Sequence, residues 1–341
     1  MKQIIRRIFT HNRPKTIVNS KMKERAYDYQ IENFGTKNKN KIFYVIKREK
    51  GSGFFSNFFF VLNHLRVAER YDFIPIIDMK NFKTIYNDTY GKFKNKNIWD
   101  LFFEKKINFK LDEVYKSKNV IFSSNKFPSD TIFDWNKNNL KNIFKKKIKI
   151  KKNIILKKNK FIKENFSGKI VGVHFRGTSY KTARTHPLQP NPKIMINLIH
   201  KLISKYNYDK IFLITEEKEY LNIMKNEFSN KLIYLKNSYR SYKDDAFKIY
   251  PRKNHRYQLA EDTLVEALIL GECNGIVSNT TNIEKAARFI SRKKRIIHEI
   301  FLGLNSNNKY IARFLWYLKS LLPEKLGGLR IIKYKTYIER N

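Results

Sequence analysis

Between residues 169 and 300 the chain alternates short apolar runs with longer segments in which apolar residues recur every three or four positions. The short runs predict strands and the longer spacing predicts amphipathic helices. Strands that alternate with helices indicate a parallel, doubly wound α/β sheet. We expect strands at 169–175, 210–215, 231–235, 275–278 and 295–300, and helices at 192–206, 218–228, 261–272 and 283–291.

A shorter unit of the same kind comes earlier in the chain. A predicted strand at 42–46 leads through Gly51-Ser52-Gly53 to a predicted helix at 54–70 and a second strand at 73–78. Together they make one βαβ unit. A chain of 341 residues suits two domains better than one. We expect a basic leader at 1–40 with some helix near 17–29, α/β domains at 41–165 and 166–305, and a basic amphipathic tail at 306–341.

Basic residues far outnumber acidic ones: 71 Lys and Arg stand against 30 Asp and Glu, and the formal net charge is +41. Such a charge is typical of proteins with an anionic partner, such as nucleic acid, an anionic membrane or a phosphorylated substrate. AT-rich codon usage, which favours lysine, accounts for part of it. The lysine-dense segment 141–163 fits either a nucleic-acid patch or a solvated connector between domains, and we favour the connector.

The expected location of the protein is cytoplasmic. No apolar run reaches the roughly 18–20 residues of a spanning helix, and the basic N-terminus lacks the long apolar segment of a secretory signal. The tail carries apolar residues at helical spacing from Tyr310 onward, with lysines beside them. This pattern fits a helix on the anionic inner face of the plasma membrane, or a helix that packs back onto the protein.

Polar side chains follow several of the predicted strands. Ligands of open parallel sheets bind where loops leave the carboxyl ends of the strands. Arg176 stands at such an end, where its guanidinium can bind a diphosphate as a planar fork. The run 278–282 precedes a predicted helix, whose N-terminal N–H groups can hold a phosphate. Helix capping alone explains one hydroxyl of this run but not five polar side chains.

Three motifs resemble those of the fucosyltransferase superfamily, which includes the nodulation, core and protein O-fucosyltransferases. The run 173–178 resembles its His-x-Arg motif, 264–282 its later motif of an acidic helix, a strand and a Ser/Thr-rich turn, and 53–57 its early glycine-rich turn with an asparagine. Their order is the order of the family. The resemblance implies a GT-B-like fold, with two Rossmann-like domains facing a cleft. It also implies a metal-independent glycosyltransferase with a nucleotide-sugar donor.

The resemblance assigns roles to individual residues. Arg176 is expected to bind the donor's β-phosphate and to stabilise the leaving diphosphate, while Asn57 reaches the same phosphate. His174 is expected to orient the donor or the loop that begins at Arg176 (the arginine loop). GDP-fucose is the first candidate donor, and a bacterial surface glycan or a lipid-linked oligosaccharide the expected acceptor. The expected donor-binding residues are Gly53, Asn57, His174, Arg176, Thr178, Ser278, Asn279, Thr280, Thr281 and Asn282.

A general base is needed if an acceptor hydroxyl attacks the donor directly. Asp78, at the end of a predicted strand, is the first candidate, although a capping role explains it slightly better; His186 and Glu216 follow. Glu261 and Asp262 lie just before the helix of the later motif (264–282), and either cap it or bind the base or ribose of the donor. No Asp-x-Asp and no His/Cys cluster with zinc spacing occurs, so we expect no metal and assign the leaving-group charge to Arg176, helix N-termini and lysines.

Two other functions remain open. Gly51-Ser52-Gly53 between a strand and a helix, with Asp78 further on, partly fits an NAD(P)-dependent Rossmann enzyme, but Ser56 replaces the third glycine. A basic nucleic-acid-binding protein fits the charge, but no recognised nucleic-acid motif is present. We therefore expect no specific nucleic-acid partner.

Overall fold

The computed structural model describes residues 30–49, 52–104, 106–128, 138–330 and 332–339. The helix expected near 17–29 lies outside these residues. The chain divides into two compact units, Met1–Lys151 (unit 1) and Lys152–Asn341 (unit 2). Among the described helices, none combines the length and apolar character that crossing a membrane requires.

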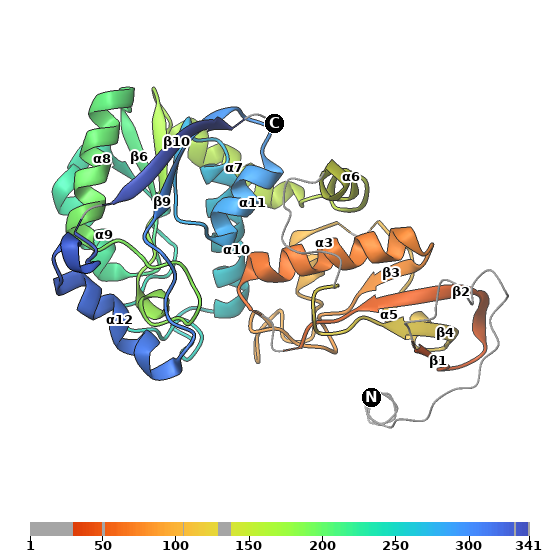
Figure 1. Cartoon of the computed structure of the whole chain (residues 1–341). Helices are drawn as coiled ribbons and strands as arrows, with labels where there is room; N and C mark the ends of the chain where they lie inside the picture. Colours follow the sequence, from red (N-terminus) through yellow and green to blue (C-terminus); the bar gives the residue numbers. More distant parts are fainter. Residues whose placement is uncertain (1–29, 50–51, 105, 129–137, 331, 340–341) are drawn as a thin grey trace. The chain divides into compact units, whose positions relative to one another are not determined.

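Unit 1 is built around a sheet with the strand order β1-β4-β2-β3 (Figure 1). Strand β2 pairs in parallel with both β3 and β4, and β1 pairs antiparallel with β4. The described elements are β1 (Ile31–Glu32), β2 (Lys37–Ile46), α3 (Phe54–Arg70), β3 (Ile74–Ile77), α4 (Trp99–Phe102), α5 (Leu111–Val114), β4 (Ser117–Phe122) and α6 (Asn138–Lys147).

The alternation of side chains along β2 explains how this sheet is covered on both faces. Phe43 and Val45 enter an apolar cluster that includes Val114 and Tyr115, at and just after α5. Tyr44 points to the other face, where its hydroxyl lies 2.7 Å from His64 Nδ1 on α3. Helix α3 has the predicted bounds, and most of its residues are buried.

The predicted leader differs from the structure in its last ten residues. Residues 31–32 form β1, and β2 begins at Lys37, before the predicted strand. The Lys/Asn-rich start of β2 has no apolar signal. It is extended because it pairs with β4, with a shift of register between Lys37 and Ile42.

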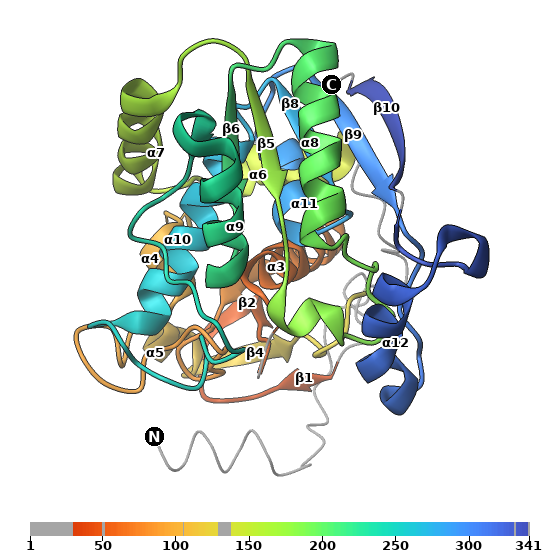
Figure 2. The same ribbon diagram turned by 90° about the vertical axis from the view of Figure 1, so that its left-hand side faces the viewer.

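Unit 2 contains a larger sheet with the order β10-β9-β8-β5-β6-β7, parallel except for β10. Figures 1 and 2 show α8 and α9 on one face and α10 and α11 on the other. The described elements are α7 (Lys152–Asn165), β5 (Ile170–His174), η1 (Thr178–Lys181), α8 (Pro192–Tyr206), β6 (Lys210–Ile214), α9 (Lys218–Phe228), η2 (Ser229–Lys231), β7 (Leu232–Ile233), α10 (His255–Leu270), β8 (Gly275–Ser278), α11 (Asn282–Ile290), β9 (Arg295–Phe301), α12 (Lys309–Leu321), η3 (Glu324–Leu326) and β10 (Lys333–Glu339).

The expected parallel α/β sheet is confirmed in this unit. Along β5, Val171, Val173 and Phe175 enter the core shared with α8 and α9. Gly172 faces the opposite way, toward Leu270 and Cys273 at the end of α10. The strand is buried on both faces, which is why its sequence reads as one continuous apolar run.

The lysine-dense segment 141–163 forms parts of α6 and α7. The units divide between these helices, at Lys151, rather than at the predicted residue 165. Helix α7 packs on α10 through ion pairs of Lys157 with Glu261 (2.6 Å) and Lys158 with Glu272 (3.0 Å). These long-range pairs, invisible in a local pattern, assign α7 to unit 2.

The predicted tail is only partly a separate element. Its first half forms the expected amphipathic helix, α12. Its second half forms β10, which pairs along its length with β9 and extends the sheet. Glu339 at the end of β10 contacts Arg288 at 2.6 Å and Arg295 at 3.3 Å. Removing the tail would therefore remove an edge strand as well as the helix.

We expect Gly172→Ala to destabilise the protein. A Cβ at this position would lie 3.0 Å from Cys273 Sγ and closer still to Leu270, and both side chains are fully buried. Overpacking of this kind costs about 1–3 kcal/mol. Gly53→Ala is the matched control, because a Cβ there meets nothing within 4 Å. Denaturant unfolding should show a lower free energy of unfolding for Gly172→Ala but not for Gly53→Ala. Equal stability of the two variants would contradict the packing described.

Candidate functional site

The predicted polar loops of unit 2 meet at one edge of its sheet. Strands β8, β5 and β6 are neighbours in this order and run parallel. Their carboxyl ends lead respectively to residues 279–282, to Arg176 and to Glu216. Three segments far apart in the sequence are thereby brought side by side, as the sequence predicts for a ligand site of an open sheet.

His174 links the β5 end to the start of α11. This buried histidine is the last residue of β5, and its Nδ1 lies 2.8 Å from Thr281 Oγ1. Thr281 is the N-cap of α11, and its hydroxyl oxygen accepts a hydrogen bond from the Glu284 N–H. Burial, with the nearby Arg176 charge, lowers the pKa of His174 to about 3. The imidazole is therefore neutral at neutral pH, which suits positioning rather than proton transfer.

The Arg176 guanidinium is held on two sides. Its Nε donates to Glu216 Oε1 at 3.2 Å, and the ring of Tyr180 lies 3.6 Å from its central carbon. The Gly177 N–H donates to the same carboxylate oxygen at 3.2 Å. Although burial raises the pKa of Glu216, the opposing effects of Arg176 and His174 leave that pKa below its ordinary value. Glu216 is thus ionised, and its Oε1 contacts both Arg176 and the Gly177 N–H; the role of a base, suggested by the sequence, stays a prediction.

The arginine loop also packs against Glu217. Gly177 packs so closely on the Glu217 carboxylate that a side chain there would collide with it. Glu217 pairs with Lys181 at 2.8 Å, and both side chains are nearly buried. The Lys181 ammonium also lies over the rings of Tyr220 and Trp316, at 4.7 and 5.3 Å. Sequence analysis did not identify this cluster, because its members are spread from 177 to 316 without a common motif.

The five polar residues 278–282 are not equivalent. The Ser278 hydroxyl donates to the Glu284 carboxylate at 2.6 Å, and the Asn279 amide donates to the side chain of Gln189. Ser278, Asn279 and Thr281 are buried, whereas Thr280 is exposed and Asn282 half-buried. Thr280 has a positive φ of 55° and lies two residues after the end of β8. The exposed backbone at Thr280 and the first turn of α11 form the part of this loop that can meet an anion.

Asp262 lies inside a helix, which corrects the predicted position before one. Helix α10 begins at His255 rather than at residue 261, because an irregular basic segment ends earlier than its sequence suggests. Asp262 accepts a hydrogen bond from Arg252 Nη1 at 2.9 Å, and burial raises its pKa. One turn on, burial raises the pKa of Glu266 to about 8, opposed by Arg240. Asp262 therefore does not cap α10, and ligand binding by it stays a prediction.

His186 and Thr178 lie on the same loop as Arg176. Thr178 begins η1. His186 is exposed, its Nδ1 lies 2.8 Å from the Arg184 carbonyl oxygen, and its ring meets the Tyr180 ring edge-on at 4.9 Å. The residue that covers the Arg176 guanidinium thus contacts His186 directly. Of the predicted catalytic residues, Arg176, Glu216 and His186 gather around one loop.

The remaining predicted residues belong to unit 1. Asp78 is fully buried, and it accepts hydrogen bonds from the Lys80 and Asn81 N–H groups and from Tyr115 at 2.6 Å. These donors occupy both oxygens, so the capping role is favoured over that of a base. Gly53 precedes α3, and its carbonyl accepts from the Asn57 N–H. The Asn57 amide nitrogen donates to the Ser52 carbonyl, while its buried Oδ1 has no hydrogen-bond partner among the residues that the structure describes.

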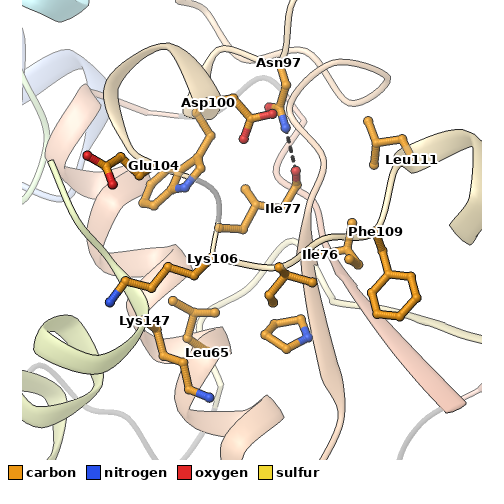
Figure 3. Close-up of a pocket in the computed structure, with 13 residues that line it drawn as sticks. Leu65, Ile76, Ile77, Asn97, Asp100, Glu104, Lys106, Phe109, Leu111 and Lys147 are labelled. Carbon is orange, nitrogen blue, oxygen red and sulfur yellow. Dashed lines mark hydrogen bonds between the residues drawn. The ribbon is translucent and has the colours of Figure 1, made fainter. Parts of the chain in front are cut away.

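A hollow lies in unit 1 along the edge strand β3 (Figure 3). Apolar side chains, among them Leu65 and Ile76, line much of it. Charged groups complete the lining: Asp100 lies near Asn97, and Lys106 and Lys147 lie near Leu65. None of the predicted site residues lines this hollow, so it is a separate feature from the loops of unit 2. Within the described ranges, no group of three or more His, Cys, Asp or Glu side chains could hold a metal ion.

Solved structures share this fold, although no protein-family model and no curated protein sequence matches the chain. The fucosyltransferase NodZ from Bradyrhizobium gives a TM-score of 0.51 at 15% identity, over 79% of this chain and 99% of its own. NodZ alpha-1,6-fucosyltransferase soaked with GDP-fucose gives a TM-score of 0.49 at 15% identity, over 79% of this chain and 100% of its own. Apo POFUT1 gives a TM-score of 0.35 at 11% identity, over 74% of this chain and 72% of its own. The likeness to the first of these confirms the resemblance to fucosyltransferases at the level of the fold.

The burial of His174 predicts a specific dependence of stability on pH. The pKa of His174 is about 3 in the folded protein, whereas that of a histidine in the unfolded chain is about 6.5. Acidification below pH 6.5 therefore protonates His174 in the unfolded state but not in the folded state. From pH 7 to pH 5 this linkage removes about 2 kcal/mol of unfolding free energy, and the loss should be absent from His174→Gln. Denaturant unfolding measures the difference. Between pH 7 and 8 both proteins should change in parallel; equal losses below pH 6.5 would contradict the prediction.

Proposed function

We propose that the protein is a glycosyltransferase that moves a sugar from a nucleoside-diphosphate donor to an acceptor hydroxyl. In this reaction the bond between the anomeric carbon and the diphosphate oxygen breaks. A bond from that carbon to the acceptor oxygen forms, and the hydroxyl proton passes to a base. The diphosphate leaves with the bonding electron pair, so negative charge builds up on it in the transition state. Groups that meet this developing charge accelerate the reaction.

The observation that carries the proposal is the position of Arg176. Its guanidinium stands at the carboxyl end of the central strand β5, where the Glu216 contact and the Tyr180 ring orient it. Arginine binds diphosphate oxygens as a planar fork. Helix α11 begins shortly after the end of the neighbouring strand β8. The partial positive charge and the backbone N–H groups at the N-terminus of α11 also suit a phosphate. The fold shared with the fucosyltransferase NodZ supports the same reading.

Fucose is the first candidate for the transferred sugar, with GDP as the nucleotide. This choice rests on the fold and on the sequence motifs, since NodZ is a fucosyltransferase and has been soaked with GDP-fucose. We infer that Arg176, Thr280 and the first turn of α11 hold the diphosphate, and that Asp262 or its neighbours on α10 meet the ribose or base. The acceptor we propose is a bacterial surface glycan or a lipid-linked oligosaccharide.

We assign Glu216 a positioning role and not that of the base. A carboxylate whose pKa is held below its ordinary value is a weak proton acceptor. Its oxygen already accepts from Arg176 Nε and from the Gly177 N–H. His186, on the exposed part of the same loop, is the candidate base that the geometry leaves open. We propose that Arg176, the α11 N-terminus and nearby lysines meet the leaving-group charge without a resident metal ion.

GDP is expected to raise the melting temperature of the wild-type protein, and EDTA should not change this shift. A ligand that binds only the folded state stabilises it by about 2.7 kcal/mol at a hundredfold excess over Kd. Arg176→Ala should abolish most of the shift, and Arg176→Lys should retain part of it, because lysine keeps the charge but not the fork. A thermal-shift series with GDP, UDP, CDP, ADP and the nicotinamide dinucleotides measures these effects.

The matched control is Lys160→Ala, which removes an exposed cation of α7 whose partner is Glu164 one turn away. This variant should keep the full GDP shift. Stabilisation by another nucleoside diphosphate, again lost in Arg176→Ala, would keep the reaction and change the donor. Stabilisation by a nicotinamide dinucleotide alone would replace the proposal with a dehydrogenase.

The two roles considered for Glu216 predict different effects of two substitutions. Glu216→Gln keeps an oxygen that can accept from Arg176 and Gly177, whereas Glu216→Ala removes it. Release of GDP from GDP-fucose, with water as the acceptor, should fall by less than about threefold in Glu216→Gln and by about tenfold or more in Glu216→Ala. If Glu216 were the base, both variants would lose about 10²–10⁴-fold.

A further inference from the structure

Helix α12 carries its large apolar side chains on its exposed face. Six of them are at least half exposed: Tyr310 (71%), Ile311 (53%), Phe314 (69%), Tyr317 (50%), Leu318 (54%) and Leu321 (75%). At about 100° per residue these positions fall within an arc of about 120° on one side of the helix. A surface helix of a globular protein normally turns such a stripe inward, toward the core.

The opposite side of α12 explains why the stripe faces outward. Ala312 and Trp316 are the buried residues of the helix, and they lie roughly opposite the stripe on the helical wheel. Trp316 packs with Leu188, Ile194 and Leu329, and its indole N–H donates to the Gln189 carbonyl at 2.7 Å. Asn308 caps the helix by accepting hydrogen bonds from two backbone N–H groups. The helix is therefore formed and anchored within unit 2 while its apolar stripe stays exposed.

The charges around the stripe have one sign. The segment 309–330 contains five basic residues and one acidic residue, Glu324, so its net charge is +4. Lys309, Arg313, Lys325 and Arg330 are exposed. Leu326, just beyond the helix, adds another side chain that is 67% exposed. An apolar stripe bordered by cations matches a surface that offers both acyl chains and negative charge.

We propose that α12 docks the protein on an anionic lipid bilayer, lying in the plane of the headgroups with its stripe against the acyl chains. A nucleic acid would satisfy the cations but leave the stripe in water. A second copy pairing stripe against stripe would bring the same cations face to face. Tyr310 and Tyr317 lie on the stripe, and tyrosine is enriched at membrane interfaces.

The anchor of α12 ties this surface to the arginine loop. The Trp316 indole N–H donates to the backbone carbonyl of Gln189, and the side-chain oxygen of Gln189 accepts a hydrogen bond from the Asn279 amide. The Lys181 ammonium lies over the Trp316 ring. A bilayer under α12 would thus bring the loop of Arg176 near the headgroups. If the glycosyltransferase proposed above is correct, this placement favours an acceptor carried on a lipid.

The test uses the full chain and sedimentation with vesicles. Binding to vesicles of phosphatidylcholine with phosphatidylglycerol is expected to exceed binding to phosphatidylcholine alone, and to weaken with salt. The triple variant Phe314→Gln, Leu318→Gln and Leu321→Gln should reduce the partition coefficient by about tenfold or more. Leu156→Gln, which changes an apolar side chain of α7 that is 55% exposed, should not reduce it.

Two further measurements separate the possible outcomes. Thermal unfolding, with and without GDP, shows whether the triple variant folds and keeps its nucleotide site independently of the membrane. Light scattering measures the mass of wild type and variant in solution. Absence of sedimentation with anionic vesicles, or unchanged binding by the folded triple variant, would overturn the proposal. A wild-type dimer that the triple variant loses, without vesicle binding, would assign the stripe to a second copy of the chain.

Discussion

One carboxylate oxygen organises the loop that follows the central strand of unit 2. Glu216 Oε1 accepts hydrogen bonds from the Arg176 side chain and from the Gly177 backbone. It therefore fixes both the direction of the guanidinium and the path of the chain beneath it. Because Arg176 is cationic, the carboxylate stays ionised in spite of its partial burial. An arginine held in place before a ligand arrives loses less conformational freedom on binding an anion.

The next carboxylate along the chain, that of Glu217, packs against the same loop. Glu217 fills the space beside Gly177 and pairs with Lys181, whose ammonium lies against Trp316 of α12. The arginine loop, the loop after β8 and α12 are thereby joined through Gln189 and Trp316. Side-chain contacts thus connect α12 directly to the arginine loop.

The strong positive charge of the chain is not spread evenly over the structure. Around the arginine loop each of Glu216, Glu217, Asp262 and Glu284 contacts a basic side chain. The local charge there is partly balanced and hydrogen-bonded, which positions cations without excessive repulsion. In α12 and the segment after it, by contrast, four cations are exposed beside one glutamate. The excess of lysine and arginine is therefore paired with carboxylates around the arginine loop, whereas it leaves exposed cations in α12 and the segment after it.

The sequence by itself determined the α/β class, the bounds of α3, α8 and α9, and the positions of Arg176 and the 278–282 run at strand ends. Periodicity reports which face of an element is buried, and a run of apolar residues reports a strand buried on both faces. The sequence could not place β1, the start of β2, β10 or α7, because long-range pairing and ion pairs hold them. Only the tertiary structure decided that Glu216 holds Arg176, that Asp78 is enclosed by Tyr115 and Asn81, and that the stripe of α12 faces outward. Each of these depends on which side chains meet in space, and residues distant in the sequence carry no local signal of that meeting.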